Sequence, residues 1–336
     1  MNIKKIKKIF YFPVNFSIIA LFITTLICCN KESDPLIPPA ESSSWIKQST
    51  NITNNLKGIY FTDSLTGYAC GNSFPNDSSK IIKTTDGGAS WHKKPVPVSA
   101  ASLNSIFFTG QNTGYACGSL GNIIKTTDAG ENWALLPVIT SNFLYDIIFY
   151  DSQTGISSGI NGTIIKTTNA GLNWQIISLP FAGTLYSIDV TLNGEAFICG
   201  DFGTVYFSSD YGSSWSLQQT PSQNTLKSIF FTEANTGYSC GQTGTLLKTT
   251  NKGVNWVILP PPATDEFTSV FFINESTGFL TGDIGAVYKT YDAGNNFTRK
   301  STPTANFLRK CFFVSPQYGW IAGESGTIIH SSMGGE

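Results

Sequence analysis

The sequence predicts an all-β fold, a seven-bladed β-propeller of four-stranded blades, and three observations predict it. A motif, Thr-x-Asp-x-Gly-x-x-Trp, recurs with small changes along most of the 336-residue chain. Each repeat unit contains four short strand-like stretches, and no helical periodicity follows the first 28 residues. The aromatic residue of the motif recurs every 41 to 46 residues, at Trp45, Trp91, Trp133, Trp174, Trp215, Trp256 and Phe297. A period near 40 residues with four strands is typical of a propeller blade.

Residues 1–28 are expected to be a lipoprotein signal peptide. A basic start with four lysines and no acid precedes an apolar stretch at 18–27, which is too short for a comfortable membrane span. The stretch ends in Leu-Ile-Cys-Cys, which looks like a lipobox with Cys29 as the lipid-bearing residue. Cys28 is the alternative acceptor, and an ordinary secretory peptide is the alternative to a lipoprotein.

Residues 29–44 are expected to form a flexible tether between the lipid and the folded domain. They are rich in Pro, Ser and Glu and carry too few apolar residues for a core. The chain is therefore expected to lie in the cell envelope, anchored to a membrane by its N-terminal lipid, either periplasmic or surface-exposed.

The propeller is expected to span residues 45–336 and to begin in the middle of a blade. Residues 45–50 align with 297–302, which form the last strand of a unit, whereas the C-terminus stops before any such strand. The two ends complement each other. We expect the N-terminal strand to complete the last blade, which closes the ring and removes open sheet edges.

Each unit then contains four strand signals in a fixed order, here named strands A to D. In the second unit they occupy residues 103–108, 113–118, 122–126 and 133–136. Strand A is expected to begin at Leu56, Leu103, Leu144, Leu185, Leu226, Phe267 and Leu308. Seven such starts predict seven blades.

The acidic position of the motif is expected to stabilise the turn between strands C and D. A carboxylate or amide oxygen there can accept backbone N–H groups of its own turn, and the following Gly supplies an unusual backbone angle. The motif resembles the Asp-box, or bacterial neuraminidase repeat. Its six structural positions are Asp86, Asp128, Asn169, Asp210, Asn251 and Asp292. Recurrence in every blade indicates a structural rather than a catalytic role.

Composition and cysteine usage narrow the classes of function. Without the first 28 residues the chain carries 17 basic and 22 acidic side chains, which disfavours nucleic acid as a partner. Five cysteines follow Cys29, four of them at one repeat position, and we expect buried thiols rather than disulfides. With only His92 and His330 as imidazoles, neither a metal nor a cofactor is expected.

The enzymatic alternative is a glycoside hydrolase or lyase of the Asp-box type. Sialidases hold their substrate carboxylate with three arginines, and this chain has only Arg299 and Arg309. A carboxylate pair drawn from Asp201, Asp283 and Glu324 could serve an inverting glycosidase, but these residues lie in repeat turns, where acids usually form local hydrogen bonds.

The repeat is similar to that of the photosystem II stability/assembly factor family. Residues 66–71, Thr-Gly-Tyr-Ala-Cys-Gly, and 80–91, which contain Thr-Thr-Asp-Gly-Gly-Ala-Ser-Trp, carry the resemblance, which extends over 45–336. It implies the propeller fold and a non-catalytic binding or assembly role. Family members that serve photosystem assembly carry an arginine-rich patch, whereas this chain has only two arginines.

The mouth of the central channel is the predicted binding site. The second residue of strand A varies between units although the scaffold repeats, and it is Lys57, Asn104, Tyr145, Tyr186, Lys227, Thr268 or Arg309. An insertion at 72–80, with Phe74, is expected to overhang the basic sector that Lys57 and Arg309 form. We expect a monomer whose mouth binds a protein or glycan partner of apolar and anionic character. A water-filled channel is the alternative.

Overall fold

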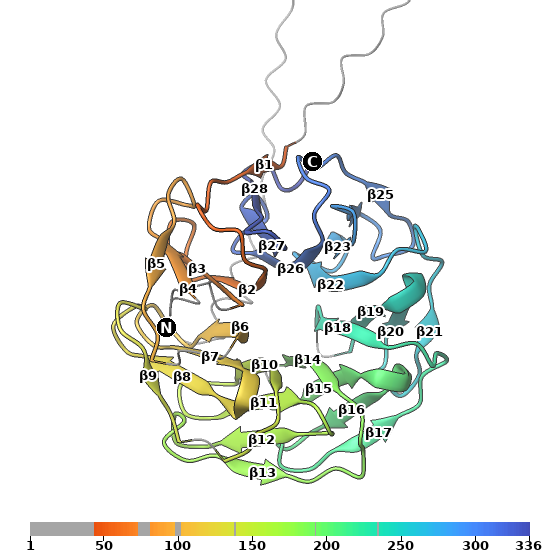
Figure 1. The fold of residues 1–336 in the computed structure, drawn as a ribbon. Helices are drawn as coiled ribbons and strands as arrows, with labels where there is room; N and C mark the ends of the chain where they lie inside the picture. Colours follow the sequence, from red (N-terminus) through yellow and green to blue (C-terminus); the bar gives the residue numbers. More distant parts are fainter. Residues whose placement is uncertain (1–43, 73–80, 98–101, 138, 192, 234) are drawn as a thin grey trace, which may run out of the picture.

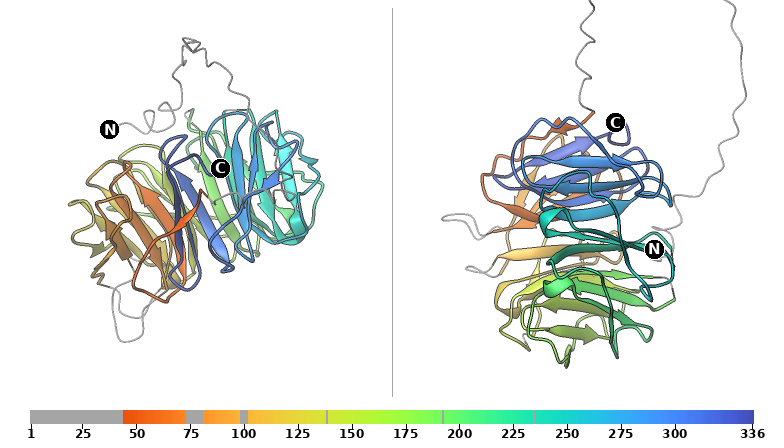
Figure 2. Two further views of the ribbon diagram at one scale, coloured as in Figure 1. Left: turned by 90° about the horizontal axis from the view of Figure 1, so that it is seen from above. Right: turned by 90° about the vertical axis from the view of Figure 1, so that its right-hand side faces the viewer.

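The computed structural model describes residues 44–72, 81–97, 102–137, 139–191, 193–233 and 235–336. Seven four-stranded antiparallel sheets form a ring around a central axis (Figure 1). Seen from the side, the strands run between the two faces of the ring (Figure 2). The predicted all-β, seven-bladed propeller is confirmed.

The strands follow the predicted order A to D in each blade, from the axis outward. Blade 1 contains β2 (Leu56–Phe61), β3 (Gly67–Gly71), β4 (Ile81–Thr84) and β5 (His92–Lys94). Blade 2 contains β6 (Leu103–Phe108), β7 (Gly114–Gly118), β8 (Ile123–Thr126) and β9 (Ala134–Leu135), with the short helix η1 (Ser119–Gly121). Blade 3 contains β10 (Leu144–Phe149), β11 (Gly155–Gly159), β12 (Ile164–Thr167) and β13 (Gln175–Ile177). Blade 4 contains β14 (Leu185–Val190), β15 (Ala196–Gly200), β16 (Val205–Ser208) and β17 (Ser216–Gln218), with η2 (Asp201–Gly203).

The remaining three blades continue the same pattern. Blade 5 contains β18 (Leu226–Phe231), β19 (Gly237–Gly241), β20 (Leu246–Thr249) and β21 (Val257–Ile258), with η3 (Gln242–Gly244). Blade 6 contains β22 (Phe267–Phe272), β23 (Gly278–Gly282), β24 (Val287–Thr290) and β25 (Thr298–Arg299). Blade 7 contains β26 (Leu308–Phe313), β27 (Gly319–Gly323) and β28 (Ile328–Ser331). All seven strands A begin at the residues that the repeat predicts.

The N-terminal strand β1 (Ile46–Lys47) completes blade 7, as predicted. It pairs antiparallel with β28, with Ile46 opposite His330, and Figure 1 shows it beside the C-terminus. Trp45, which is 1% exposed, packs edge-on against Phe279 and Phe313. Because β28 runs toward the C–D turn, antiparallel β1 begins at that end of the blade and runs toward the opposite face.

Neighbouring blades pack through aromatic rings of strand A, each of which also lies against the glycine that begins strand B of its own blade. In blade 2 the ring of Phe108 stacks on Tyr68 of blade 1, with centroids 4.1 Å apart, and meets Trp133 edge-on. A Cβ added to Gly114, at the start of β7, would lie 2.6 Å from the Phe108 ring. In six blades strand B therefore begins with glycine so that the strand-A phenylalanine can lie flat against the backbone, whereas blade 4 has Ala196 opposite Val190.

The C–D turns fold around their acidic residue. In blade 2, Asp128 Oδ1 accepts the backbone N–H of Asn132 at 2.9 Å and the Thr126 hydroxyl at 2.8 Å. The Thr126 Oγ1 accepts the backbone N–H of Gly130 at 2.9 Å. Asn169 accepts the same backbone N–H in its own turn, as does Asn251. The hydrogen bonds from Asn132 and Thr126 lower the pKa of Asp128 to about 2.

Strands B and C of one blade bond to the C–D turn of the next. The Tyr115 hydroxyl donates to the Ala170 carbonyl at 3.0 Å, and Lys125 Nζ donates to the same oxygen at 2.9 Å. At the seam between blades 7 and 1, the Trp320 indole takes this role and donates to Gly87 O at 3.1 Å. These contacts tie the C–D turns to the blade packing.

Several predictions lie outside the described residues. They are the signal peptide at 1–28, nearly all of the tether at 29–44, the lipid acceptors Cys28 and Cys29, and Phe74. Among the described residues, no helix is long and apolar enough to cross a membrane. The five described cysteines are buried and unbridged.

Candidate binding site in the channel mouth

One mouth of the central channel opens into a cavity of about 390 Å³. It lies where the strands A begin, on the face that also carries the B–C turns. The seven second residues of strand A all line it: Lys57, Asn104, Tyr145, Tyr186, Lys227, Thr268 and Arg309. The structure thus brings together the described residues that the sequence analysis selected for this mouth.

A β-bulge in each strand A turns these side chains toward the axis. In blade 2, Leu103 pairs with Gly118 and Ser105 pairs with Cys117, so that Asn104 between them has no partner on β7. The same irregularity occurs at the start of strand A in all seven blades. A bulge re-aims a side chain without breaking the sheet, so the ring can hold different residues at one fixed position.

Two tyrosines and a lysine form the aromatic side of the mouth. The rings of Tyr145 and Tyr186 meet edge-on with centroids 5.0 Å apart. Lys227 Nζ lies 3.8 Å from the centroid of the Tyr186 ring, a cation–π geometry. Burial lowers the pKa of Lys227, and both tyrosines are partly buried. This side offers rings that can stack on an apolar group.

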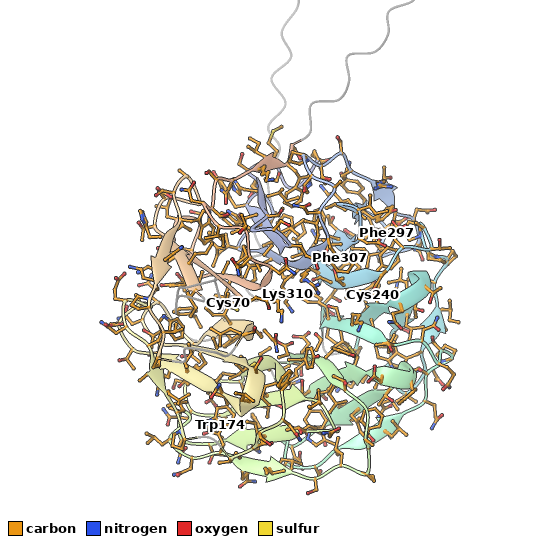
Figure 3. The ribbon with its side chains drawn as sticks, viewed as in Figure 1. Cys70, Trp174, Cys240, Phe297, Phe307 and Lys310 are labelled. Atoms are coloured by element: carbon orange, nitrogen blue, oxygen red, sulfur yellow. The ribbon has the colours of Figure 1, made fainter. Side chains whose placement is uncertain are left out.

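Three cationic side chains form the basic side, on the adjacent blades 1 and 7. Lys57 Nζ donates to the neutral Asn104 Oδ1 at 2.9 Å, and burial followed by the Arg309 charge lowers its pKa. Arg309 pairs with Glu324, but its buried Nε has no partner among the described residues. Lys310 lines the same cavity, and its label lies at the edge of the central opening (Figure 3). Within the described chain, neither Lys57 nor Lys310 has a carboxylate partner.

Sequence reasoning missed three charged residues of the cavity: Lys310, Asp146 and Glu266. Lys310 and Asp146 occupy the third position of strand A, which is serine in four other blades. Three of those serines, Ser187, Ser228 and Ser269, each accept a backbone N–H from strand A of the next blade. Asp146 accepts the hydroxyl of the fourth, Ser105, at 2.6 Å and the Ile188 N–H at 3.0 Å. A comparison of the third position across repeats would have singled out Lys310.

The other end of the channel is aromatic. A smaller cavity of about 160 Å³ shares Lys310 and Asp146 with the first. The Tyr60 ring lies 4.8 Å from that of Phe312, and Phe230 lies 5.0 Å from Phe271, between ring centroids. The channel therefore runs from a polar mouth to an apolar one.

The carboxylates considered for catalysis lie in B–C turns. Asp201 accepts the backbone N–H of Thr184 at 2.8 Å and the Thr225 hydroxyl at 3.1 Å, and Glu324 pairs with Arg309. Asp283 Oδ1 is buried without a partner among the described residues. In this same part of the chain, no three His, Cys, Asp or Glu side chains cluster as metal ligands.

A family model described as "Photosynthesis system II assembly factor YCF48" matches residues 37–141 and 131–223, more than half of the chain. The chain belongs to this family. No curated protein matches it.

Solved structures share the fold at low sequence identity. One described as "YCF48 bound to D1 peptide" has a TM-score of 0.74 at 20% identity and covers 90% of this chain and 99% of its own. YCF48 from Cyanidioschyzon merolae has a TM-score of 0.72 at 16% identity, over 86% and 99%. A streptogramin B lyase structure has a TM-score of 0.74 at 13% identity, over 85% and 97%. At these identities the likeness extends to the fold alone.

Proposed function

We propose that this chain is a non-catalytic, extracytoplasmic binding or assembly-factor propeller, anchored to the cell envelope by a lipid on Cys29. Its polar mouth binds a protein segment that carries an acidic group beside an apolar side chain. The observation that carries this proposal is the mouth itself, where Lys57 and Lys310 have no carboxylate partner among the described residues and face a pair of tyrosine rings. A relative solved with a D1 peptide supports a polypeptide as the partner.

The charges of the mouth favour an anionic ligand. Desolvation disfavours a charged amine, and the lowered pKa of Lys57 reflects that burial and the nearby Arg309 charge. A carboxylate placed between Lys57, Arg309 and Lys310 would supply the missing countercharge through charge-assisted hydrogen bonds. The Tyr145 and Tyr186 rings on the other side would then contact a neighbouring apolar group.

We also infer that the C–D turns are Asp-boxes with a structural role only. Their acidic residue accepts hydrogen bonds within its own turn, as for Asp128 and Asp210. In every blade the turn lies on the face away from the polar mouth. Binding is therefore assigned to the mouth and not to the repeated motif.

Selection from a random peptide display library on the immobilised chain tests this function. We expect the selected peptides to be enriched in Asp or Glu together with aromatic or aliphatic residues. Lys57→Gln/Lys310→Gln should remove the acidic enrichment and weaken individual selected peptides roughly tenfold or more. Tyr145→Ala/Tyr186→Ala should weaken the apolar preference.

A glycan array run in parallel distinguishes the other class of ligand. Selected peptides without acidic residues, or with unchanged affinity for the lysine variants, would contradict the proposal. Binding of glycans in place of peptides, lost in the tyrosine variant, would assign the mouth to a sugar. Each variant is first checked for an unchanged melting temperature.

A further inference from the structure

The B–C turns around the polar mouth hold residues other than glycine in the left-handed backbone region. In each of the six described turns, such a residue precedes a glycine that also has positive φ. These residues are Leu120 (φ 60°), Asn161 (φ 55°), Phe202 (φ 59°), Thr243 (φ 56°), Ile284 (φ 50°) and Ser325 (φ 53°).

Local turn chemistry explains Asn161 but not the apolar residues among the six. Two consecutive positive φ values define the turn for which Asn-Gly is the preferred pair, and blade 3 has that pair as Asn161-Gly162. Leu and Phe are disfavoured there because their Cβ crowds the following carbonyl, and the β-branched Thr243 and Ile284 are disfavoured most. Blades 2, 4, 5 and 6 thus carry a residue that destabilises its own turn, and in blades 2, 4 and 6 this residue is apolar.

Burial does not compensate for this strain. The side chains of Leu120, Phe202 and Ile284 are 55%, 67% and 67% exposed. A strained backbone with an exposed apolar side chain does not stabilise the isolated protein. Such local conflicts are typical of functional surfaces.

The three apolar turns surround the mouth on alternate blades. Each turn follows strand B, whose last residue pairs with the first residue of strand A, as Gly118 pairs with Leu103. Leu120 therefore lies on the blade of Asn104, Phe202 on that of Tyr186, and Ile284 on that of Thr268. We call Leu120, Phe202 and Ile284 the apolar crown.

The charges beside the crown favour a polypeptide over a membrane surface. Asp201 and Asp283 directly precede Phe202 and Ile284, and Glu266 lines the cavity. These acids would repel anionic lipid headgroups, whereas the mouth between them is cationic through Lys57, Arg309 and Lys310. An extended segment with its acidic residue in the mouth and apolar residues on either side matches this arrangement.

We propose that the apolar crown is the second contact surface for the polypeptide partner and that its strain is retained for binding. The acidic residue of the partner occupies the mouth, and flanking apolar residues bury the crown. This inference rests on the proposed function of the mouth.

Replacing all three crown residues by asparagine tests the inference. Leu120→Asn/Phe202→Asn/Ile284→Asn should raise the melting temperature by roughly 5 °C, because asparagine fits the left-handed conformation. In the peptide display selection, acidic enrichment should persist while enrichment of flanking apolar residues is lost. Peptides selected on the parent chain should bind the variant roughly tenfold more weakly.

The matched control is Ala129→Asn/Ala170→Asn/Ala293→Asn, on the opposite face. These alanines share the left-handed conformation, with φ of 57°, 56° and 57°. This variant should also gain stability, but peptide binding should not change. A crown variant that gains stability and keeps its apolar selectivity overturns the crown alone, whereas a parent chain that selects no acidic peptides overturns the mouth and the crown together. Crown-dependent binding to phosphatidylglycerol vesicles, with peptide selection unchanged, overturns the choice of partner.

Discussion

At the residue scale, two side-chain types recur in most blades: an Asp or Asn that folds the C–D turn and a glycine that makes room for an aromatic ring. Both act through short contacts that the repeat reproduces. The acid accepts N–H groups of its own turn, as Asp128 does, and the glycine provides space, as Gly114 does under Phe108. Each contact leads to a testable prediction, one about protonation of the carboxylate and one about a methyl group added to the glycine.

The turn carboxylates should make stability depend on acid. The pKa of each of three turn carboxylates, Asp86, Asp128 and Asp210, is lowered to about 2. Hydrogen bonds from their own turns are the main cause for Asp86 and Asp128. For Asp210, burial raises the pKa, and the hydrogen bonds of its turn outweigh that effect. A folded pKa below the unfolded value of roughly 3.9 gives stability that is present above pH 4 and lost as pH falls toward 2. The Asp86→Asn/Asp128→Asn/Asp210→Asn variant keeps the acceptor oxygen without the titration. Its melting temperature should fall less than that of the parent between pH 5 and pH 2.5, and parallel curves would contradict this origin of the acid sensitivity.

The ring-on-glycine contact should not tolerate a methyl group. Gly114→Ala places a Cβ 2.6 Å from the Phe108 ring, which packs against Tyr68 and cannot retreat. Overpacking of this kind costs about 1–3 kcal/mol, measured as the free energy of unfolding in urea. Gly110→Ala is the control, since no atom lies within 4 Å of its added Cβ. Equal effects of the two substitutions would show that the contact does not limit the packing.

At the element scale, the repeat predicted the four strands of each blade, but it predicted the shape of the inner strand only in part. Every strand A begins where the apolar pattern predicts, because its first residue must be buried between blades. The bulge after Leu103 was not predictable, since it appears only as a shift in pairing between β6 and β7. Asp146 and Lys310 were missed because only the second position of strand A was expected to line the channel, although at the third position both differ from the serine of four other blades. The variable second position was found because variation within a fixed scaffold is visible in the sequence.

Closure of blade 7 by β1 makes a prediction at this scale. A chain that begins at residue 51 lacks Trp45, which is buried against Phe279 and Phe313. Loss of a buried tryptophan costs about 3–5 kcal/mol, and removal of β1 also exposes the edge of β28. The melting temperature should fall by roughly 10 °C or more. A chain that begins at residue 44 is the control and should melt like the parent; a shared melting temperature for all three chains would refute closure as a source of stability.

At the scale of the whole molecule, the two faces of the ring differ in chemistry. One face carries the B–C turns, the polar mouth and the apolar crown, whereas the other carries the C–D turns that brace neighbouring blades. A family fold does not determine which ligand a propeller binds, because the scaffold is shared by proteins of unrelated function. Lys57 and Lys310, which have no carboxylate partner among the described residues, and the crown are features of this chain, and under the proposed function they select its ligand.

The proposed anchoring to the envelope also concerns the whole molecule. Cys29→Ala should move the protein from the membrane fraction to the soluble fraction, because an acyl chain contributes roughly 0.8 kcal/mol per buried CH₂. Mass spectrometry of the N-terminal peptide checks for the acyl groups directly. Cys28→Ala is the matched variant and should stay membrane-bound; the reverse result would assign the lipid to Cys28.

The direction of β1 has a consequence for how the molecule would be oriented. Because β1 starts at the C–D turn side, the chain that leads back to Cys29 joins the ring on the face opposite the mouth. A lipid on Cys29 would therefore be attached through the face opposite the mouth. The distance between the lipid and the ring would be up to roughly 50 Å when the sixteen residues of the tether are extended. The tether would then leave the mouth free to face away from the anchoring bilayer. The mouth would then stay accessible to a partner, because the tether joins the other face of the ring.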